Sequence, residues 1–160
     1  MNKIKVAFVC HGNICRSPMA QYIFQSLIDN ENISDYFYVD SFATSYEEIG
    51  NGIYPSARRT LNKHSILGPF THRAKRITIN DYKDFDYILI MDDNNLYNLL
   101  RIIGRDDDSK VYKLKNFNSN SGEIEDPWYT DNFEKVYIEI EKGCKDLLKF
   151  LKDKYGLGEI

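Results

Sequence analysis

The sequence predicts an α/β fold of one domain, residues 1–160, with a four-stranded, doubly wound parallel sheet flanked by helices on both faces. Apolar runs of strand length alternate with segments of helical periodicity along the chain, which is typical of this class. Residues 87–91 are apolar at every position, as expected of a parallel strand covered on both faces. A chain of 160 residues is long enough to bury one core. We expect a flavodoxin-like strand order.

The N-terminal half supplies two strands and two helices. An apolar run at 4–10 predicts the first strand, and a second strand is expected at 37–42. Between them, apolar residues recur at helical spacing over 17–30. The second helix is expected over 55–64, because Pro55 suits the first helical position.

The C-terminal half begins with a short helix at 80–85, for which Asn80 is the expected cap. A strand, a helix ended by Gly104, a short strand and a long amphipathic helix follow. They are expected at 87–91, 94–103, 110–113 and 132–154.

Composition excludes several classes of function. A formal net charge of −3 argues against a nucleic-acid-binding protein and against a basic protein of membrane surfaces. No apolar stretch reaches the length of a membrane span. The N-terminal residues lead directly into the first predicted strand, so we do not expect a secretory signal. Three cysteines do not form a disulfide framework, so we expect a reducing, cytoplasmic location.

Residues 10–17, which read CHGNICRS, join the first strand to the first helix. This is the carboxyl end of a parallel strand, where α/β proteins bind ligands. Unpaired N–H groups at a helix start attract an anion and favour a thiolate at Cys10. Arg16 adds a planar donor for phosphate oxygens, Gly12 permits close backbone approach, and Asn13 tolerates left-handed dihedral angles. The alternative is a buried structural cysteine beside a surface arginine.

This segment resembles the phosphate loop of protein tyrosine phosphatases, and its extended form at 9–18 is similar to that of the low-molecular-weight class. Further stretches resemble that family in the same order along the chain. They are 39–41 with 44–45 and Gly50, then 72–74 with 85–92, and finally 126–129. The resemblance implies a monomer that hydrolyses phosphotyrosine in proteins or peptides and small aryl phosphates. It implies phosphate, sulfate or vanadate as ligands of the site, with no cofactor and no metal.

Roles follow for the residues of this loop and of the stretch at 126. Cys10 is the expected nucleophile, and Ser17 is expected to donate a hydrogen bond to its sulfur. Asp126 is the candidate general acid and then base; without the loop at 10–17, an Asp-Pro pair more often marks a turn. The Arg16 guanidinium and the loop amides are expected to hold the phosphate oxygens. Those amides belong to His11, Gly12, Asn13, Ile14, Cys15 and Arg16.

Four residues are expected around the mouth of the pocket. Trp128 and Tyr129 would wall it with aromatic faces that grip a phenyl ring, which favours phosphotyrosine over the shorter phosphoserine. The ordinary alternative for both is a core or surface aromatic. Tyr46 and Glu47 fall where the family has its pocket rim, so the resemblance implies that they set substrate preference and that Glu47 disfavours acidic peptides.

The resemblance also implies a reversible disulfide between Cys10 and Cys15 that protects the nucleophile, whereas Cys144 is expected in the core. It implies a hydrogen bond from His64 to Asn13. His72 is expected to be a structural or surface residue. Asp92 and Asp93 are better explained as helix caps than as site residues.

Three rival functions remain to be weighed. An arsenate reductase on this scaffold would need two further cysteines near the middle of the chain, and residues 16–143 contain none. A catalytically silent phosphate-binding module would be expected to lack Cys10 or Asp126, and both are present. A redox sensor built on Cys10 and Cys15 is compatible as regulation.

Overall fold

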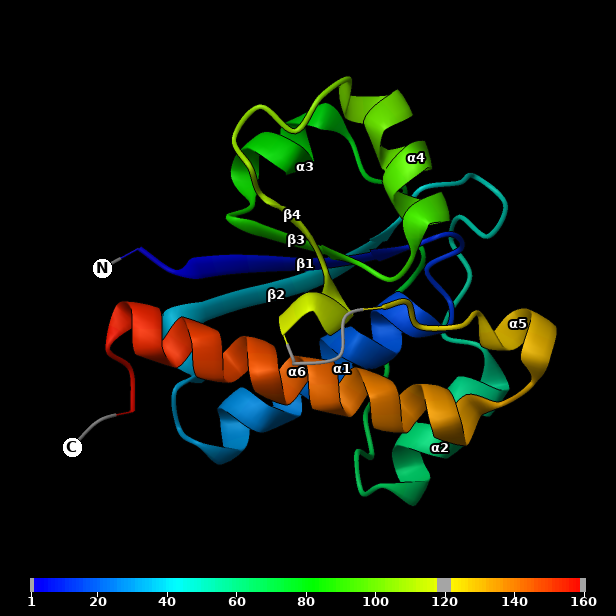
Figure 1. Ribbon diagram of the computed structural model, residues 1–160. Helices are drawn as coiled ribbons and strands as arrows, with labels where there is room; N and C mark the ends of the chain where they lie inside the picture. Colours follow the sequence, from blue (N-terminus) through cyan, green and yellow to red (C-terminus); the bar gives the residue numbers. More distant parts are fainter. Residues whose placement is uncertain (1, 118–121, 159–160) are drawn as a thin grey trace.

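The computed structural model describes residues 2–117 and 122–158. At its centre is one parallel sheet of four strands (Figure 1). They are β1 (Ile4–Cys10), β2 (Phe37–Ala43), β3 (Tyr87–Ile90) and β4 (Val111–Lys113). The order β2-β1-β3-β4 confirms the predicted fold class and its flavodoxin-like arrangement. The central strand β1 pairs with β2 along its whole length, so Cys10 lies opposite Ala43.

Helices cover both faces of the sheet, as predicted (Figure 1). One face carries α3 (Ile79–Asp84) and α4 (Asp93–Ile103). The other face carries α1 (Arg16–Asn30), α2 (Pro55–Lys63) and α6 (Phe133–Tyr155). Short helical turns complete the described chain: η1 (Ser34–Tyr36), η2 (Leu114–Phe117) and α5 (Pro127–Thr130).

The period of the strand explains why β1 is apolar at every position except Lys5. Val6 and Phe8 pack into the core on the side of α1 and α6, whereas Ala7 and Val9 pack into the core on the side of α3 and α4. All four are completely buried. A strand that is buried on both faces cannot shift easily. The position of its carboxyl end is therefore fixed, and so is the start of the loop that follows.

The start of α3 differs from the expectation. Thr78 caps this helix, and the prediction of Asn80 as its cap is wrong. The Thr78 hydroxyl accepts from the Asp81 N–H at 3.2 Å, and Asp81 Oδ2 accepts from the Thr78 N–H at 2.9 Å. This reciprocal pair satisfies two helix-end donors, which the lone Asn80 side chain could not do. Pro55 does begin α2, as predicted.

The elements bring several loops to the carboxyl end of the sheet. The segment after β1, the chain after β2 and the turn that contains α5 gather there, and the N-terminus lies at the other end (Figure 1). In the two ranges that the structure describes, no helix combines the length and the apolar character needed to cross a membrane.

Candidate active site

Residues 10–16 connect β1 to α1, and we call them the anion loop. Asn13 adopts the left-handed conformation expected of it, with φ of 60°. The carbonyl groups of the loop are bound from outside: Cys10 O accepts from Thr44 N at 2.9 Å and Ile14 O from Tyr54 N at 2.9 Å. The N–H groups of residues 11–16 find no acceptor in the described parts of the chain. They are therefore free to bind an anion, and α1 begins without a side-chain cap.

Cys10 lies buried beneath this loop, with 3% of its surface exposed. Its sulfur is 3.0 Å from Ser17 Oγ, and the Ser17 N–H also points at it, at 3.4 Å. Asn13 Nδ2 donates to Ser17 Oγ at 2.7 Å, so the hydroxyl hydrogen of Ser17 is left to donate either to the sulfur or to the Phe42 carbonyl at 3.5 Å; the shorter contact favours the sulfur. Two donors on one sulfur stabilise its anionic form.

The Asn13 amide holds the loop through four hydrogen bonds. Its two N–H groups donate to Ser17 and Ser41, and its oxygen accepts from Lys75 N at 3.2 Å and from His72 Nε2 at 2.8 Å. Every hydrogen-bonding position of this buried side chain is used, which fixes the strained turn of the loop.

The histidine on Asn13 is therefore His72, and the expectation that His64 would bind there is wrong. His64 lies at the C-terminal end of α2, where it stacks on Tyr137 and contacts Glu134 at 2.6 Å. His72 is buried, and this burial lowers its pKa below 6.5, although Asp40 opposes the effect. The neutral ring carries its proton on Nε2, because the Asn13 oxygen can only accept.

Arg16 is 2% exposed and enters the site from the first turn of α1. Its Nη1 donates to Asp92 Oδ2 at 2.7 Å and to the Ile124 carbonyl at 2.8 Å. Burial works to lower the pKa of Arg16, but the neighbouring Cys10, Asp92 and Asp126 together raise it above its ordinary value. The guanidinium therefore stays charged and is aimed by groups from two other segments.

Asp92 has a role that the sequence did not reveal. Its Oδ1 accepts from Asn95 N at 2.8 Å and caps α4, as expected, while Oδ2 binds Arg16. The signal was available only in part: an acidic residue directly after β3 lies at the ligand-binding edge of the sheet.

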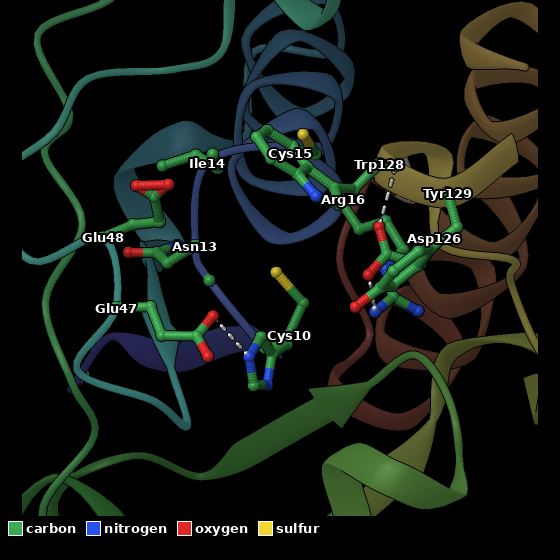
Figure 2. Close-up of a pocket in the computed structure, with 12 residues that line it drawn as sticks. Cys10, Asn13, Ile14, Cys15, Arg16, Glu47, Glu48, Asp126, Trp128 and Tyr129 are labelled. Atoms are coloured by element: carbon green, nitrogen blue, oxygen red, sulfur yellow. Dashed lines mark hydrogen bonds and ion pairs between the residues drawn. The ribbon is translucent and has the colours of Figure 1, made fainter. Parts of the chain in front are cut away.

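Asp126 lies beside Arg16 at the edge of the pocket (Figure 2). Its Oδ2 is 3.5 Å from Arg16 Nη2, and its Oδ1 accepts from the Trp128 N–H at 3.0 Å (Figure 2). One quarter of the side chain is exposed, so a bound substrate and water can reach it. The aspartate caps α5, as the turn interpretation expects.

The pocket has a volume of about 540 Å³, including the space at its open mouth. Glu47 and Glu48 stand on one side, and Asp126, Trp128 and Tyr129 stand on the other (Figure 2). The floor and lower walls come from the anion loop.

The rim differs in part from the expectation. Glu48 lines the pocket and was missed, whereas Tyr46 does not line it. Tyr46 is 71% exposed, and the centre of its ring lies 4.3 Å from the Arg76 guanidinium. Glu47 Oε2 contacts His11 Nε2 at 2.9 Å, which ties the rim to the anion loop.

Trp128 and Tyr129 project from α5 into solvent, with 54% and 84% of their surfaces exposed. Tyr54, which the sequence did not single out, supports Trp128 by an edge-on contact at 5.2 Å. Neither exposed ring belongs to the core, so the alternative of a core aromatic is excluded for both.

The other two cysteines are buried. Burial raises the pKa of Cys15, and burial likewise raises that of Cys144, which is completely enclosed between α6 and α1. All three cysteines are free thiols. Within residues 2–117 and 122–158, no three His, Cys, Asp or Glu side chains gather as a metal ion would require.

Comparison with known proteins gives one consistent family. Residues 5–156 match the model of the family described as low molecular weight phosphotyrosine protein phosphatase. The rat protein of that name is 40% identical over 150 residues, which cover 90% of this chain and 93% of the relative. The low molecular weight protein-tyrosine-phosphatase PtpA of Staphylococcus aureus is 36% identical over 157 residues, covering 98% of this chain and 99% of the relative.

Solved structures agree. The low molecular weight protein tyrosine phosphatase SP-PTP from Streptococcus pyogenes has a TM-score of 0.85 at 39% identity, covering 99% of this chain and all of that one. YfkJ from Bacillus subtilis has a TM-score of 0.92 at 33% identity, covering 96% and 98%. A protein tyrosine phosphatase from Entamoeba histolytica, solved with Hepes in its active site, has a TM-score of 0.85 at 28% identity, covering 96% and 99%.

Proposed function

The chain belongs to the low molecular weight phosphotyrosine protein phosphatase family and is an enzyme of that type, and we propose that it hydrolyses phosphotyrosine in proteins and small aryl phosphates through a phosphocysteine on Cys10. One observation carries the proposal. The Cys10 sulfur lies beneath N–H groups of residues 11–16 that bind no acceptor among residues 2–117 and 122–158, and beside the buried, charged Arg16. This combination places a nucleophile where a phosphate group would be bound.

In the first step the Cys10 thiolate attacks phosphorus, and the bond from phosphorus to the phenolic oxygen breaks. The amides of the anion loop and the Arg16 guanidinium stabilise charge on the three equatorial oxygens. Protonated Asp126 gives its proton to the departing phenolate. The position of this carboxyl at the open side of the pocket supports the assignment, because the leaving group must point toward solvent.

In the second step Asp126, now ionised, accepts a proton from water as that water attacks phosphorus. The bond between sulfur and phosphorus breaks, inorganic phosphate forms, and Cys10 leaves as a thiolate. The two hydrogen bonds from Ser17 support this departure, since they stabilise negative charge on the sulfur. The protein returns to its starting state with Asp126 protonated after phosphate release.

Substrate class follows from the shape of the pocket. A phosphotyrosine ring would lie against Trp128 and Tyr129, while its phosphate reaches the anion loop. The shorter phosphoserine would have to draw its backbone into the pocket. Glu47 and Glu48 place carboxylates at the mouth, which disfavours acidic peptides. Phosphate, sulfate and vanadate would bind as ligands of the same loop.

Three further proposals concern the thiols, the location of the protein and its oligomeric state. Peroxide would oxidise Cys10 and Cys15 to a disulfide, with the peroxide reduced to water, and a thiol would later restore both. Mass spectra after peroxide treatment test this, and sulfinic acid at Cys10 without any disulfide would contradict it. The need for a reduced Cys10 favours a cytoplasmic location, and the site needs only one chain, which favours a monomer.

Steady-state rates test the proposed function. We expect rapid hydrolysis of phosphotyrosine peptides, much slower hydrolysis of phosphoserine peptides, and competitive inhibition by vanadate. Cys10→Ser should abolish turnover and keep phosphate binding. Equal rates on phosphotyrosine and phosphoserine would contradict the assigned substrate class, and turnover by Cys10→Ser would contradict the mechanism.

A further inference from the structure

The position of Asp126 depends on a short extended segment, residues 123–126, which we call the acid strap. Its inward residues contact the site: Ile124 is completely buried, its N–H donates to Met91 O at 3.0 Å, and its carbonyl accepts from Arg16. Asp126 follows, with its carboxylate toward the same guanidinium. Two residues of the strap, Ile124 and Asp126, therefore contact Arg16. The backbone of the strap determines the direction of the Asp126 side chain.

The outward residues of the acid strap are held by cations. Glu123 Oε2 accepts from the Asp93 N–H at 2.5 Å, at the start of α4, and lies 3.6 Å from Lys113 Nζ. Glu125 Oε1 lies 2.6 Å from Lys135 Nζ, in the first turn of α6. The strap is thus fastened to α4 on one side and to α6 on the other.

The ion pair with Lys135 fixes the charge of Glu125. It is the main cause that lowers the pKa of Glu125, so this carboxyl stays ionised. The Glu125 carboxylate therefore joins the residue before Asp126 to the first turn of α6.

The backbone around Lys135 is itself fixed. Its N–H donates to Asn132 Oδ1 at 3.2 Å, which caps α6. The ammonium group consequently projects from a defined helical turn toward Glu125. The Lys135 side chain is 57% exposed and that of Glu125 is 25% exposed. An ion pair this exposed contributes little to the stability of the fold. A loss of activity in variants of the pair would therefore reflect a change in geometry and not a loss of stability.

We infer that Glu125 and Lys135 are positioning residues for the general acid: their ion pair holds the acid strap so that Asp126 faces the leaving group. This inference rests on the proposed function, because it concerns the same carboxyl. Without the pair, Asp126 samples orientations that do not reach the phenolic oxygen, whereas the anion loop and Arg16 keep their contacts. Proton transfer to the leaving group then suffers, and phosphate binding does not.

Leaving-group dependence of kcat/KM tests the inference, because this ratio reports steps up to departure of the phenolate. The variants are Glu125→Gln and Lys135→Gln. The matched control is Lys149→Gln, which removes an exposed ion pair with Asp153 elsewhere on α6. We expect kcat/KM for phenyl phosphate to fall about tenfold in the two test variants. For a dinitrophenyl phosphate, which needs no acid, the loss should stay below about twofold.

Two more measurements separate positioning from damage to the fold. The inhibition constant of inorganic phosphate should not change in any variant, and Lys135→Arg should restore the wild-type leaving-group dependence. An equal loss on both substrates, or wild-type ratios in both test variants, would overturn the inference. The Asp126→Ala variant tests the proposed function separately. If it shows a strong leaving-group dependence and the test variants show none, Asp126 remains the general acid and the positioning role of Glu125 and Lys135 is contradicted. If Asp126→Ala also shows none, both fall.

Discussion

Arg16 Nη1 donates to Asp92 Oδ2 at 2.7 Å, although 76 positions separate the two residues in the sequence. The other oxygen of the same carboxylate caps α4 by accepting from Asn95 N. One side chain thus starts a helix and aims the guanidinium of the anion loop. Because Arg16 is almost fully buried, its orientation depends on these fixed acceptors and not on solvent.

Asp92→Asn should therefore weaken catalysis while α4 remains capped. Asparagine is as good a cap as aspartate, but its single oxygen cannot serve both Asn95 and Arg16. A hydrogen bond to a charged group contributes about 1.5–3 kcal/mol, so kcat/KM should fall about 10- to 100-fold.

The neighbouring Asp93→Asn is the matched control, because Asp93 pairs with Lys113 and not with Arg16. Steady-state kinetics on an aryl phosphate, with circular dichroism to confirm folding, measure the difference. Equal activity of the two variants would show that Asp92 does not aim the arginine.

Asp126→Ala should slow aryl phosphates according to their leaving groups. Loss of a general acid costs about 10²- to 10⁴-fold where the leaving group needs a proton. Phenyl phosphate should show this loss in kcat/KM, and a dinitrophenyl phosphate should show much less. Equal slowing of both substrates would remove Asp126 as the acid.

His72 should make stability depend on pH. Its pKa in the folded protein is lowered below 6.5 by burial, so the unfolded chain takes up a proton first as the pH falls. The stability that His72 contributes is present above pH 6.5 and is lost as the pH falls from there to its folded value.

Urea unfolding of the wild type and of His72→Gln at about pH 7.5 and about pH 5 measures this effect. The wild type should be the more stable of the two at the higher pH, and the difference should shrink at the lower pH. The other titrating groups are common to both proteins, so their effect on stability cancels when the two free energies of unfolding are subtracted. A difference that grows toward low pH would mean that the folded pKa is raised.

Gly143→Ala should destabilise the fold, although alanine favours helices. A Cβ at Gly143 would lie 2.7 Å from Leu114 Cγ, and Leu114 is completely buried in η2. Overpacking costs about 1–3 kcal/mol and exceeds the helical gain of up to about 1 kcal/mol.

Urea unfolding of Gly143→Ala measures the free energy of unfolding, with the exposed Lys142→Ala on the same helix as its control. The cost should shrink in a background that carries Leu114→Ala, because the clash is then absent. A Gly143→Ala variant as stable as the wild type would contradict the close packing of α6 on η2.

Local patterns predicted the fold and the centre of the site. The apolar run of β1 and the helical start at residue 16 determine the anion loop, so the place of Cys10 and Arg16 could be inferred from their neighbours. Contacts between residues far apart in the sequence could not be predicted in this way. His72 binds Asn13 over 59 positions, and nothing in spacing distinguishes it from His64. Glu48, and not Tyr46, lines the pocket because the chain after β2 turns in a way that no local pattern specifies.

The central claim is that the Cys10 sulfur accepts the phosphoryl group, and rapid quenching tests it most directly. Wild-type protein mixed with an aryl phosphate, quenched in denaturant within the first turnover and digested, should carry a phosphoryl group on the peptide that contains Cys10. The peptide that contains Cys144 should remain unmodified, and Cys10→Ser should carry no phosphoryl group at all. Release of phosphate with no phosphorylated Cys10 at any time would contradict the account.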